Sequence, residues 1–467
     1  MRAVGIGVGG CVLTVALGAL DQSIVATAMP SIAIALDNVT QLGWIVAAYL
    51  LALTALTVPF GKITDRYGSR VVLLGSIVLF VASSMVCALA QNIWELIAAR
   101  ALQGGGGAGL IIGSQSTMAG LLSPRDRGLY SSFVSATNAI AAIAGPVAGA
   151  FFVQHLTWRW LFWINLPIGL LAFVICARIP SVRTHEEPQP VDAASLVLVA
   201  LSATAFVLVC SWSTMWTWNS LQVVIAAIAG FATSVLFVVR ERRSRTPLFS
   251  QRLTRSKTVR LLNGVIFIVS TSMFCVIVLV PAYVQYALGG SASQAGTLLV
   301  PMLVSVSIAG FITANMIRLT GRYRFLMPGG CSLIAAGLGM LAFETQGTHA
   351  PSHPALASAL AIVGLGIGFC IPTINVVIQN SADPRDLGVA ISTIFFSRSI
   401  GGAFGATVFW SIVLAVSGGA AHIRPAAFSL AFAVAAAAAL AALVVALMVP
   451  ERPLLTTRPG ERNAAPA

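Results

Sequence analysis

The carboxylates are the side chains of this sequence best suited to acid–base chemistry, and one of them has unusual surroundings. Asp21 lies near the middle of ALGALDQSIVATAMP, residues 16–30, where almost every neighbour is apolar or small. Inside a bilayer an ionised carboxylate without a partner costs several kcal/mol, so ionisable residues in apolar segments mark functional sites. Asp21 therefore needs a cationic partner or a proton, and it is a candidate proton-binding residue.

The other acidic residues lie in less demanding places. Of the 14 Asp and Glu residues, Glu95 and Glu344 fall near the expected outer ends of apolar segments. The rest fall in expected loops, tails or segment edges, at Asp37, Asp65, Asp126, Glu186, Glu187, Asp192, Glu241, Asp383, Asp386, Glu451 and Glu461. Asp21 is thus the one carboxylate expected deep within a span.

Other chemistry has little support in the sequence. The five histidines fall in expected loops, and the seven cysteines are odd in number and scattered. We therefore expect no metal site, no disulfide framework and no cofactor.

The composition predicts an all-α integral membrane protein. Of 467 residues, 58% are hydrophobic and only 9% are charged, whereas about a quarter of a soluble domain is charged. Apolar runs long enough to cross a bilayer as helices recur along the whole chain. We count about fourteen, at residues 4–29, 42–60, 71–90, 94–118, 129–152, 161–178, 193–211, 220–239, 259–282, 293–316, 326–345, 355–379, 388–413 and 427–449.

The net charge of +13 comes from basic residues on one side of these spans. With a cytoplasmic N-terminus, all 27 Lys and Arg residues fall in cytoplasmic segments except Arg159 and Arg424 outside, and Arg100 and Arg398 within spans. The positive-inside rule then predicts that both termini are cytoplasmic, in a cell inner membrane. Nucleic-acid binding is unnecessary to explain the charge.

A cleaved leader is an alternative for the first segment, since ATA at 26–28 imitates a cleavage site, but apolar character resumes after Asp21.

An internal duplication divides the chain. GKITDRYGSR after the second span aligns with MIRLTGRYRF after the tenth, which pairs Lys62 with Arg318. SPRDRG before the fifth span parallels DPRDLG before the thirteenth, in a register that pairs Gly145 with Gly405. Two repeated six-helix halves are typical of secondary transporters with a substrate site at their interface, although short basic loops can also match by coincidence. The predicted divisions are an N-terminal half (1–180), an inserted two-helix segment (181–257), a C-terminal half (258–450) and a cytoplasmic tail (451–467).

Four stretches together resemble the major facilitator superfamily, specifically its fourteen-span drug:proton antiporter branch. They are LDQSIVATAMP in the first span, GKITDRYGSR after the second, RALQGGGGAG in the fourth, and AGPVAGAFF in the fifth followed by WRWLFWINLPIG at 158–169. The resemblance covers nearly the whole chain, and it implies proton-coupled export by alternating access.

The stretch GKITDRYGSR is a candidate cytoplasmic gate motif, formed by Gly61, Lys62, Asp65, Arg66, Gly68 and Arg70. Its glycines allow close approach and a tight turn. The resemblance implies that Asp65 and Arg66 stabilise one conformation through contacts with neighbouring helix ends. The alternative is a basic loop that only orients the span. The second copy has Gly321 in place of Asp65, so the same role is not expected there.

Two further motifs combine small residues within spans. In the fourth span, Arg100, Gln103 and Gly104 open a glycine run that lets helices pack closely; the run lacks a Walker lysine, so a phosphate-binding loop is excluded. In the fifth span, Gly145, Pro146 and Gly149 favour a kink or a sliding contact. The resemblance links this antiporter motif to exporters.

These motifs suggest a mechanism in which Asp21 binds and releases a proton and Arg100 is its partner. The alternative is a structural carboxylate capped by Ser23 or Thr27, or paired permanently with Arg100. Arg398, in the thirteenth span, is a second buried charge whose partner the sequence does not reveal unless it is an anionic substrate.

The sequence and the resemblance therefore predict a monomeric proton-coupled antiporter that exports small lipophilic drugs or antibiotics, with protons, the substrate and the lipid bilayer as its partners. A transporter of an endogenous metabolite or lipid is an alternative. A polytopic membrane enzyme is another, but no paired carboxylates and no His within a span would support catalysis.

Overall fold

The computed structural model describes residues 2–36, 42–122, 127–179, 192–215, 220–244, 256–290, 292–346, 352–382, 386–417 and 424–450. Within these ranges the regular structure is entirely helical. The first helices are α1 (Arg2–Ala35), α2 (Leu42–Tyr67), α3 (Ser69–Leu89), α4 (Ile93–Leu121), α5 (Arg127–His155), α6 (Trp160–Trp163) and α7 (Asn165–Cys176). They are followed by α8 (Ala193–Met215) and α9 (Leu221–Arg243). The last are α11 (Lys257–Ala282) with its π-helical extension η1 (Tyr283–Ala287), α12 (Ala292–Thr320), α13 (Leu326–Glu344), α14 (His353–Ser381), α15 (Leu387–Ser417) and α16 (Pro425–Leu447).

The all-α membrane fold predicted from the sequence is confirmed. Each of the expected spans corresponds to one of these helices, except that the sixth is divided into α6 and α7 and the ninth continues into η1. Among the described residues, 11 helices are long and apolar enough to cross a membrane, and two shorter apolar stretches occupy Trp160–Cys176 and Ala193–Phe206.

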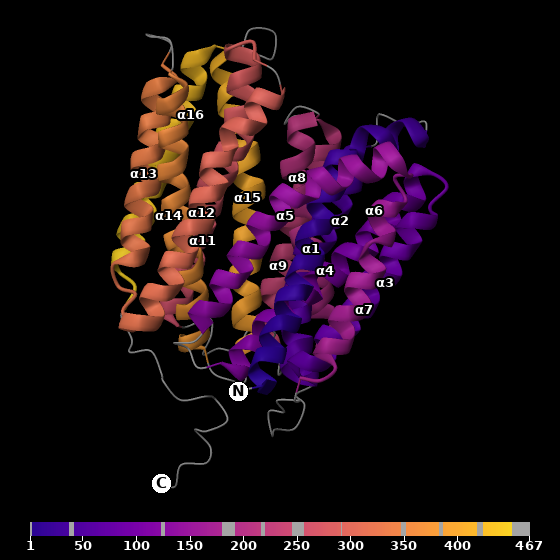
Figure 1. Cartoon of the computed structure of the whole chain (residues 1–467). Helices are drawn as coiled ribbons and strands as arrows, with labels where there is room; N and C mark the ends of the chain where they lie inside the picture. Colours follow the sequence, from indigo (N-terminus) through magenta and orange to yellow (C-terminus); the bar gives the residue numbers. More distant parts are fainter. Residues whose placement is uncertain are drawn as a thin grey trace.

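The same helix pairs pack together in the two groups of helices seen in Figure 1. α2 packs on α4, α3 on α4 and α1 on α5, while α12 packs on α14, α13 on α14 and α11 on α15. Between the groups, α2 meets α15 and α5 meets α12. These are equivalent pairs under the repeat expected from the sequence, so the packing has the pseudo-symmetry of repeated halves. The inserted helices α8 and α9 pack on each other, and α8 also contacts α2 and α15.

Glycines bring the helices into direct backbone contact at equivalent places. A Cβ at Gly104 of α4 would lie 2.2 Å from the carbonyl oxygen of Tyr49 on α2. In the second half, a Cβ at Gly364 of α14 would lie 2.3 Å from the carbonyl oxygen of Met302 on α12. No larger side chain fits at this separation, so these residues fix how closely the helices approach.

Most of the described Lys and Arg residues lie at or next to the helix ends on the side of the bundle where α1 begins, at the bottom of Figure 1, which we term the basic end. They are Lys62, Arg66, Arg70, Arg178, Arg240, Arg242, Arg243, Lys257, Arg260, Arg318, Arg322 and Arg324. Arg159 and Arg424 lie at the opposite end, before α6 and α16. The positive-inside rule predicts that the basic end faces the cytoplasm.

Candidate functional site

Asp21 lies fully buried on α1, with donors from two other helices around its carboxylate. Its Oδ2 accepts a hydrogen bond from Nη1 of Arg100 at 2.6 Å. Its Oδ1 accepts from Nε2 of Gln103 at 2.9 Å and from Nδ2 of Asn165 at 2.8 Å. These three donors, one of them a guanidinium, are partners that stabilise an ionised carboxylate.

Arg100 and Gln103 share one face of α4 because they are separated by three residues. Nη1 of Arg100 also donates to Oε1 of Gln103 at 2.6 Å, and its Nε donates to the carbonyl of Ile45 at 3.3 Å. The guanidinium carbon lies 4.4 Å from the ring centroid of Tyr49. Arg100 is 1% exposed, so these contacts replace water around the buried charge. The expectation that Arg100 has a partner inside the bundle is met by Asp21.

Ser84 and Asn165 complete this network, and sequence reasoning missed both. The Oγ of Ser84 accepts from Gln103 at 3.2 Å and from Asn165 at 2.8 Å, and it donates to the carbonyl of Phe162 at 3.1 Å. The division between α6 and α7 falls directly before Asn165 and places its amide toward α1. The available signal was the one that identified Asp21, because each is a polar residue within an apolar segment.

The structure also limits the alternative partners considered for Asp21. The Oγ of Ser23 donates to the carbonyl of Ala19 on its own helix at 3.0 Å, so it does not cap the carboxylate. The side chain of Thr27 lies outside the described residues.

The gate motif joins the two halves through Asp65. Its Oδ1 accepts from the backbone N–H of Gly388 at 2.6 Å and its Oδ2 from that of Val389 at 2.9 Å. These are the first N–H groups of α15, where the partial positive charge of the helix favours a carboxylate. A Cβ at Gly388 would lie 2.5 Å from the carbonyl oxygen of Gly61, so both glycines are required for this contact.

The remaining gate residues have different surroundings. Gly68 turns the chain between α2 and α3 with φ +89°, and Arg70 donates to the carbonyl of Ala177 at the end of α7. Among the described residues, Arg66 Nε is buried without a hydrogen-bond partner, and the guanidinium carbon lies 5.2 Å from the Tyr67 ring centroid. The structure therefore places Asp65, and not Arg66, on a helix end.

The second copy of the motif lacks this contact for a structural reason. α12 ends at Thr320, and Gly321 forms the turn with φ +67°. The position aligned with Asp65 is thus a turn that favours glycine, whereas α2 continues as a helix to Tyr67.

The antiporter motif lies against α1 close to Asp21. A Cβ at Gly145 would lie 2.3 Å from Cβ of Ser23. A Cβ at its counterpart Gly405 on α15 would lie 2.3 Å from the carbonyl oxygen of Thr271 on α11. α5 is described as one continuous helix through this motif, with Gly149 buried. The side chain of Pro146 lies outside the described residues.

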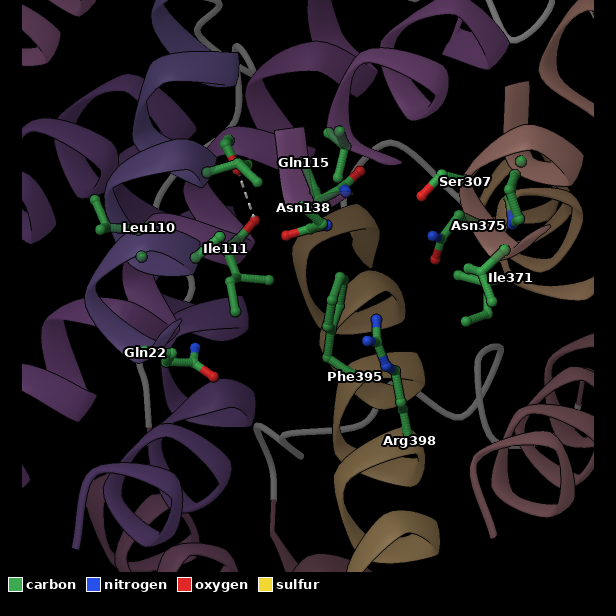
Figure 2. Close-up of a pocket in the computed structure, with 18 of the residues that line it drawn as sticks. Gln22, Leu110, Ile111, Gln115, Asn138, Ser307, Ile371, Asn375, Phe395 and Arg398 are labelled. Atoms are coloured by element: carbon green, nitrogen blue, oxygen red, sulfur yellow. Dashed lines mark hydrogen bonds between the residues drawn. The ribbon is translucent and has the colours of Figure 1, made fainter. Parts of the chain in front are cut away.

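A cavity of about 410 Å³ lies between the halves, lined by α1, α2, α4 and α5 and by α11, α12, α14 and α15. Figure 2 shows its polar residues on both sides: Gln22, Gln115 and Asn138 from the first half, and Ser307, Asn375 and Arg398 from the second. The apolar lining includes Leu110, Ile111, Ile371 and Phe395. The lining helices are those expected from the sequence.

Tyr49 lies between the cavity and the buried network, since it lines the cavity and also contacts the Arg100 guanidinium. On the side toward the basic end, Gln379 Nε2 donates to Gln115 Oε1 at 3.4 Å, and Ala119 packs near Ile391 across the halves. The halves are therefore in contact between the cavity and the Asp65 contact.

This arrangement of two similarly packed halves around a central cavity can be compared with known proteins. The sequence matches the model of the Major Facilitator Superfamily over residues 11–406, with a further match over 262–467. The chain belongs to the major facilitator superfamily. It is therefore a multi-pass membrane transporter.

Relatives within the superfamily include the multidrug transporter protein MdtP of Bacillus subtilis (strain 168). The two are 32% identical over 410 residues, which cover 88% of this chain and 75% of that protein. Multidrug resistance protein 3 of the same organism is 29% identical over 405 residues, 86% of this chain and 78% of that protein. The structure of the proton:xylose symporter XylE superposes with a TM-score of 0.68 over 96% of both chains. At 15% identity, this last likeness shows the superfamily fold alone.

Proposed function

We propose that this transporter is a proton-coupled antiporter that exports lipophilic drugs or antibiotics by alternating access. The observation that carries the proposal is the fully buried Asp21–Arg100 pair beside a cavity shared by the two halves. Such a pair inside a membrane protein is costly to keep, and intramembrane ionisable groups mark proton or substrate pathways.

Protonation of Asp21 would change the network around it. The ionised carboxylate accepts from Arg100, Gln103 and Asn165. A protonated carboxyl loses its charge attraction to Arg100 and needs an acceptor for its own proton. Asn165 Oδ1 is buried without a hydrogen-bond partner among the described residues, so a turned amide could supply that acceptor. The two protonation states therefore favour different side-chain arrangements, and these bias the helices that carry them.

Tyr49 offers a route from this network to the substrate. Its ring contacts the Arg100 guanidinium on one side and lines the cavity on the other, and its backbone is held against Gly104. A substrate in the cavity and a proton on Asp21 would thus act on the same segment of α2.

The Asp65 contact supports alternation between two arrangements of the halves. It joins α2 to the first turn of α15 at the basic end, which the positive-inside rule assigns to the cytoplasm. Opening the cavity to that side requires both of these hydrogen bonds to break. Arg66, Lys62 and Arg70 complete the proposed gate around them.

Export as the direction rests on the antiporter motif Gly145, Pro146 and Gly149, and on the printed names of the two multidrug relatives. The protein would act as a monomer in the cytoplasmic membrane, with both termini in the cytoplasm. Its partners would be protons, lipid and a small lipophilic substrate.

The test compares Asp21→Asn with the wild type in everted membrane vesicles, with a fluorescent drug probe added to the outer solution, which contacts the cytoplasmic face. An imposed pH gradient should drive uphill transport by the wild type and none by Asp21→Asn, whereas both should bind the probe. Normal proton-driven transport by Asp21→Asn would contradict the proposal.

Asp192→Asn is the matched control. Asp192 lies just before α8, and hydrogen bonds from Arg240 at 2.9 Å lower its pKa to about 2. The Asp192 carboxylate is negatively charged above about pH 2 and becomes protonated only as the pH falls through about 2. It therefore stays ionised at every pH at which transport is measured. Asp192→Asn should therefore transport as the wild type does.

A further inference from the structure

The cavity contains a cation that the Asp21 network does not use. Arg398 lines the cavity from α15. In Figure 2 its side chain extends from α15 into the space between the halves, beside Phe395 of the same helix. Asn375 and Ser307 of the second half face the same space.

No carboxylate stands beside this guanidinium in the described part of the chain. Neither the Arg100–Asp21 ion pair nor the Arg240–Asp192 ion pair of the described residues involves Arg398. The described residues that line the cavity include no Asp or Glu, and their polar members other than Arg398 are neutral, such as Gln22, Gln115, Asn138 and Asn375. The described lining therefore carries a net positive charge.

The comparison with Arg100 shows what Arg398 lacks. Both lie within the bundle, but Arg100 has a carboxylate at 2.6 Å and an aromatic ring against its guanidinium. An arginine keeps its charge at all accessible pH values, so it cannot avoid the cost of its position by losing a proton. Since no described side chain supplies a counter-charge for Arg398, a molecule bound in the cavity would supply it.

The apolar residues of the lining indicate the chemistry of the remaining part of a bound molecule. Leu110 and Ile111 face the cavity from the first half, and Ile371 and Phe395 from the second. A guanidinium binds a planar oxyanion through two parallel hydrogen bonds, and the surrounding apolar side chains favour an apolar body.

Building on the proposed export function, we propose that the substrates are amphiphilic organic anions, such as carboxylates on an apolar body, with the anionic group bound to Arg398. Neutral analogues lose the charge-assisted hydrogen bonds, and cations are repelled. The cavity therefore binds lipophilic anions more tightly than lipophilic cations of similar size.

The test uses three probes that share a naphthalene body: 1-naphthylacetate, its neutral amide and 1-naphthylethylammonium. Their affinities are measured by calorimetry on the purified full-length protein, without any pH gradient. The wild type should bind the anion at least about tenfold more tightly than the amide, as a charge-assisted bond predicts, and the cation most weakly.

Variants assign the preference to one side chain. Arg398→Gln should bind the anion and the amide equally, and Arg398→Lys should keep part of the preference because it keeps the charge but not the planar fork. Arg424→Gln, at an exposed arginine before α16, should bind as the wild type does. Equal binding of the three probes by the wild type, or an undiminished preference in Arg398→Gln, would overturn the proposal. If Arg398→Gln does not fold, the wild type and Arg398→Lys still decide it.

This test separates the anion site from the export function. An anion preference in a protein that shows no proton-driven transport would keep the site and reject the coupling. Proton-driven transport of the cation and the amide as fast as of the anion would keep the coupling and reject the site.

Discussion

At the scale of single residues, Arg100 and Arg398, which both lie within the bundle, differ in where their counter-charge comes from. Arg100 is neutralised by Asp21 of the same half, and Gln103 and Asn165 hold the carboxylate in place. Arg398 has no such acid among the described residues and faces the cavity instead. The first arrangement is suited to a proton and the second to a substrate.

The pairing of Asp21 with Arg100 predicts a specific pattern of stability. Arg100→Gln leaves a buried carboxylate unpaired and should destabilise the protein by about 3–5 kcal/mol, as loss of one partner of a buried ion pair does. The double variant Asp21→Asn/Arg100→Gln removes both charges and should recover a large part of that loss. Thermal unfolding in detergent measures both, and a double variant no more stable than Arg100→Gln would show that the two side chains are not coupled.

At the scale of helices, α15 connects the Asp65 contact to the cavity between the halves. Its first turn donates to Asp65 through Gly388 and Val389, and Arg398 lies nine residues further along, about 14 Å at the helical rise. An anion bound to Arg398, as proposed above, would therefore act on the same helix whose first turn joins the two halves at the basic end.

Removal of the Asp65 carboxylate should weaken the contact between the two halves at the basic end. Asp65→Ala loses two charge-assisted hydrogen bonds between α2 and α15, so the arrangement open to the basic end should become more populated. A cysteine placed at Ala119, which is buried where the halves meet, reports this opening through its rate of maleimide labelling. Labelling should be several-fold faster in Asp65→Ala, and an unchanged rate would show that the contact does not hold the halves closed. The chain without the added cysteine gives the background.

At the scale of the whole molecule, the sequence predicts the helical architecture and the position of Asp21 within a span well. The reason is that a polar or charged group inside the bilayer has a large free-energy cost. Span lengths, the basic end and the position of Asp21 all follow from the cost of polar groups in lipid. The repeat pairs Gly145 with Gly405, and each of them lies against the first helix of its own half, α1 and α11.

Other features leave weaker signals in the sequence. Ser84 and Asn165 are neutral, so a place in a span costs them little and does not distinguish them from other polar residues. The partners of Asp65 are backbone N–H groups, which every residue except proline provides. The division of the sixth span before Asn165 coincides with Pro167, which has no backbone N–H to donate to the carbonyl of Trp163, so the stretch WRWLFWINLPIG does contain a local signal for it.

Arg398, which has no carboxylate partner among the described residues, also gives the proposed transport cycle an electrical consequence. When an anion occupies the cavity, the two charges cancel, and the loaded rearrangement moves little charge at this site through the membrane field. The empty cavity carries a net positive charge on its return toward the cytoplasm, and a negative-inside membrane potential pulls it inward. Each elementary charge that crosses a potential of 100 mV changes free energy by about 2.3 kcal/mol. Potassium diffusion potentials set with valinomycin, at equal pH on both sides, should therefore change the transport rate of 1-naphthylacetate in the wild type, and the voltage dependence should weaken in Arg398→Gln.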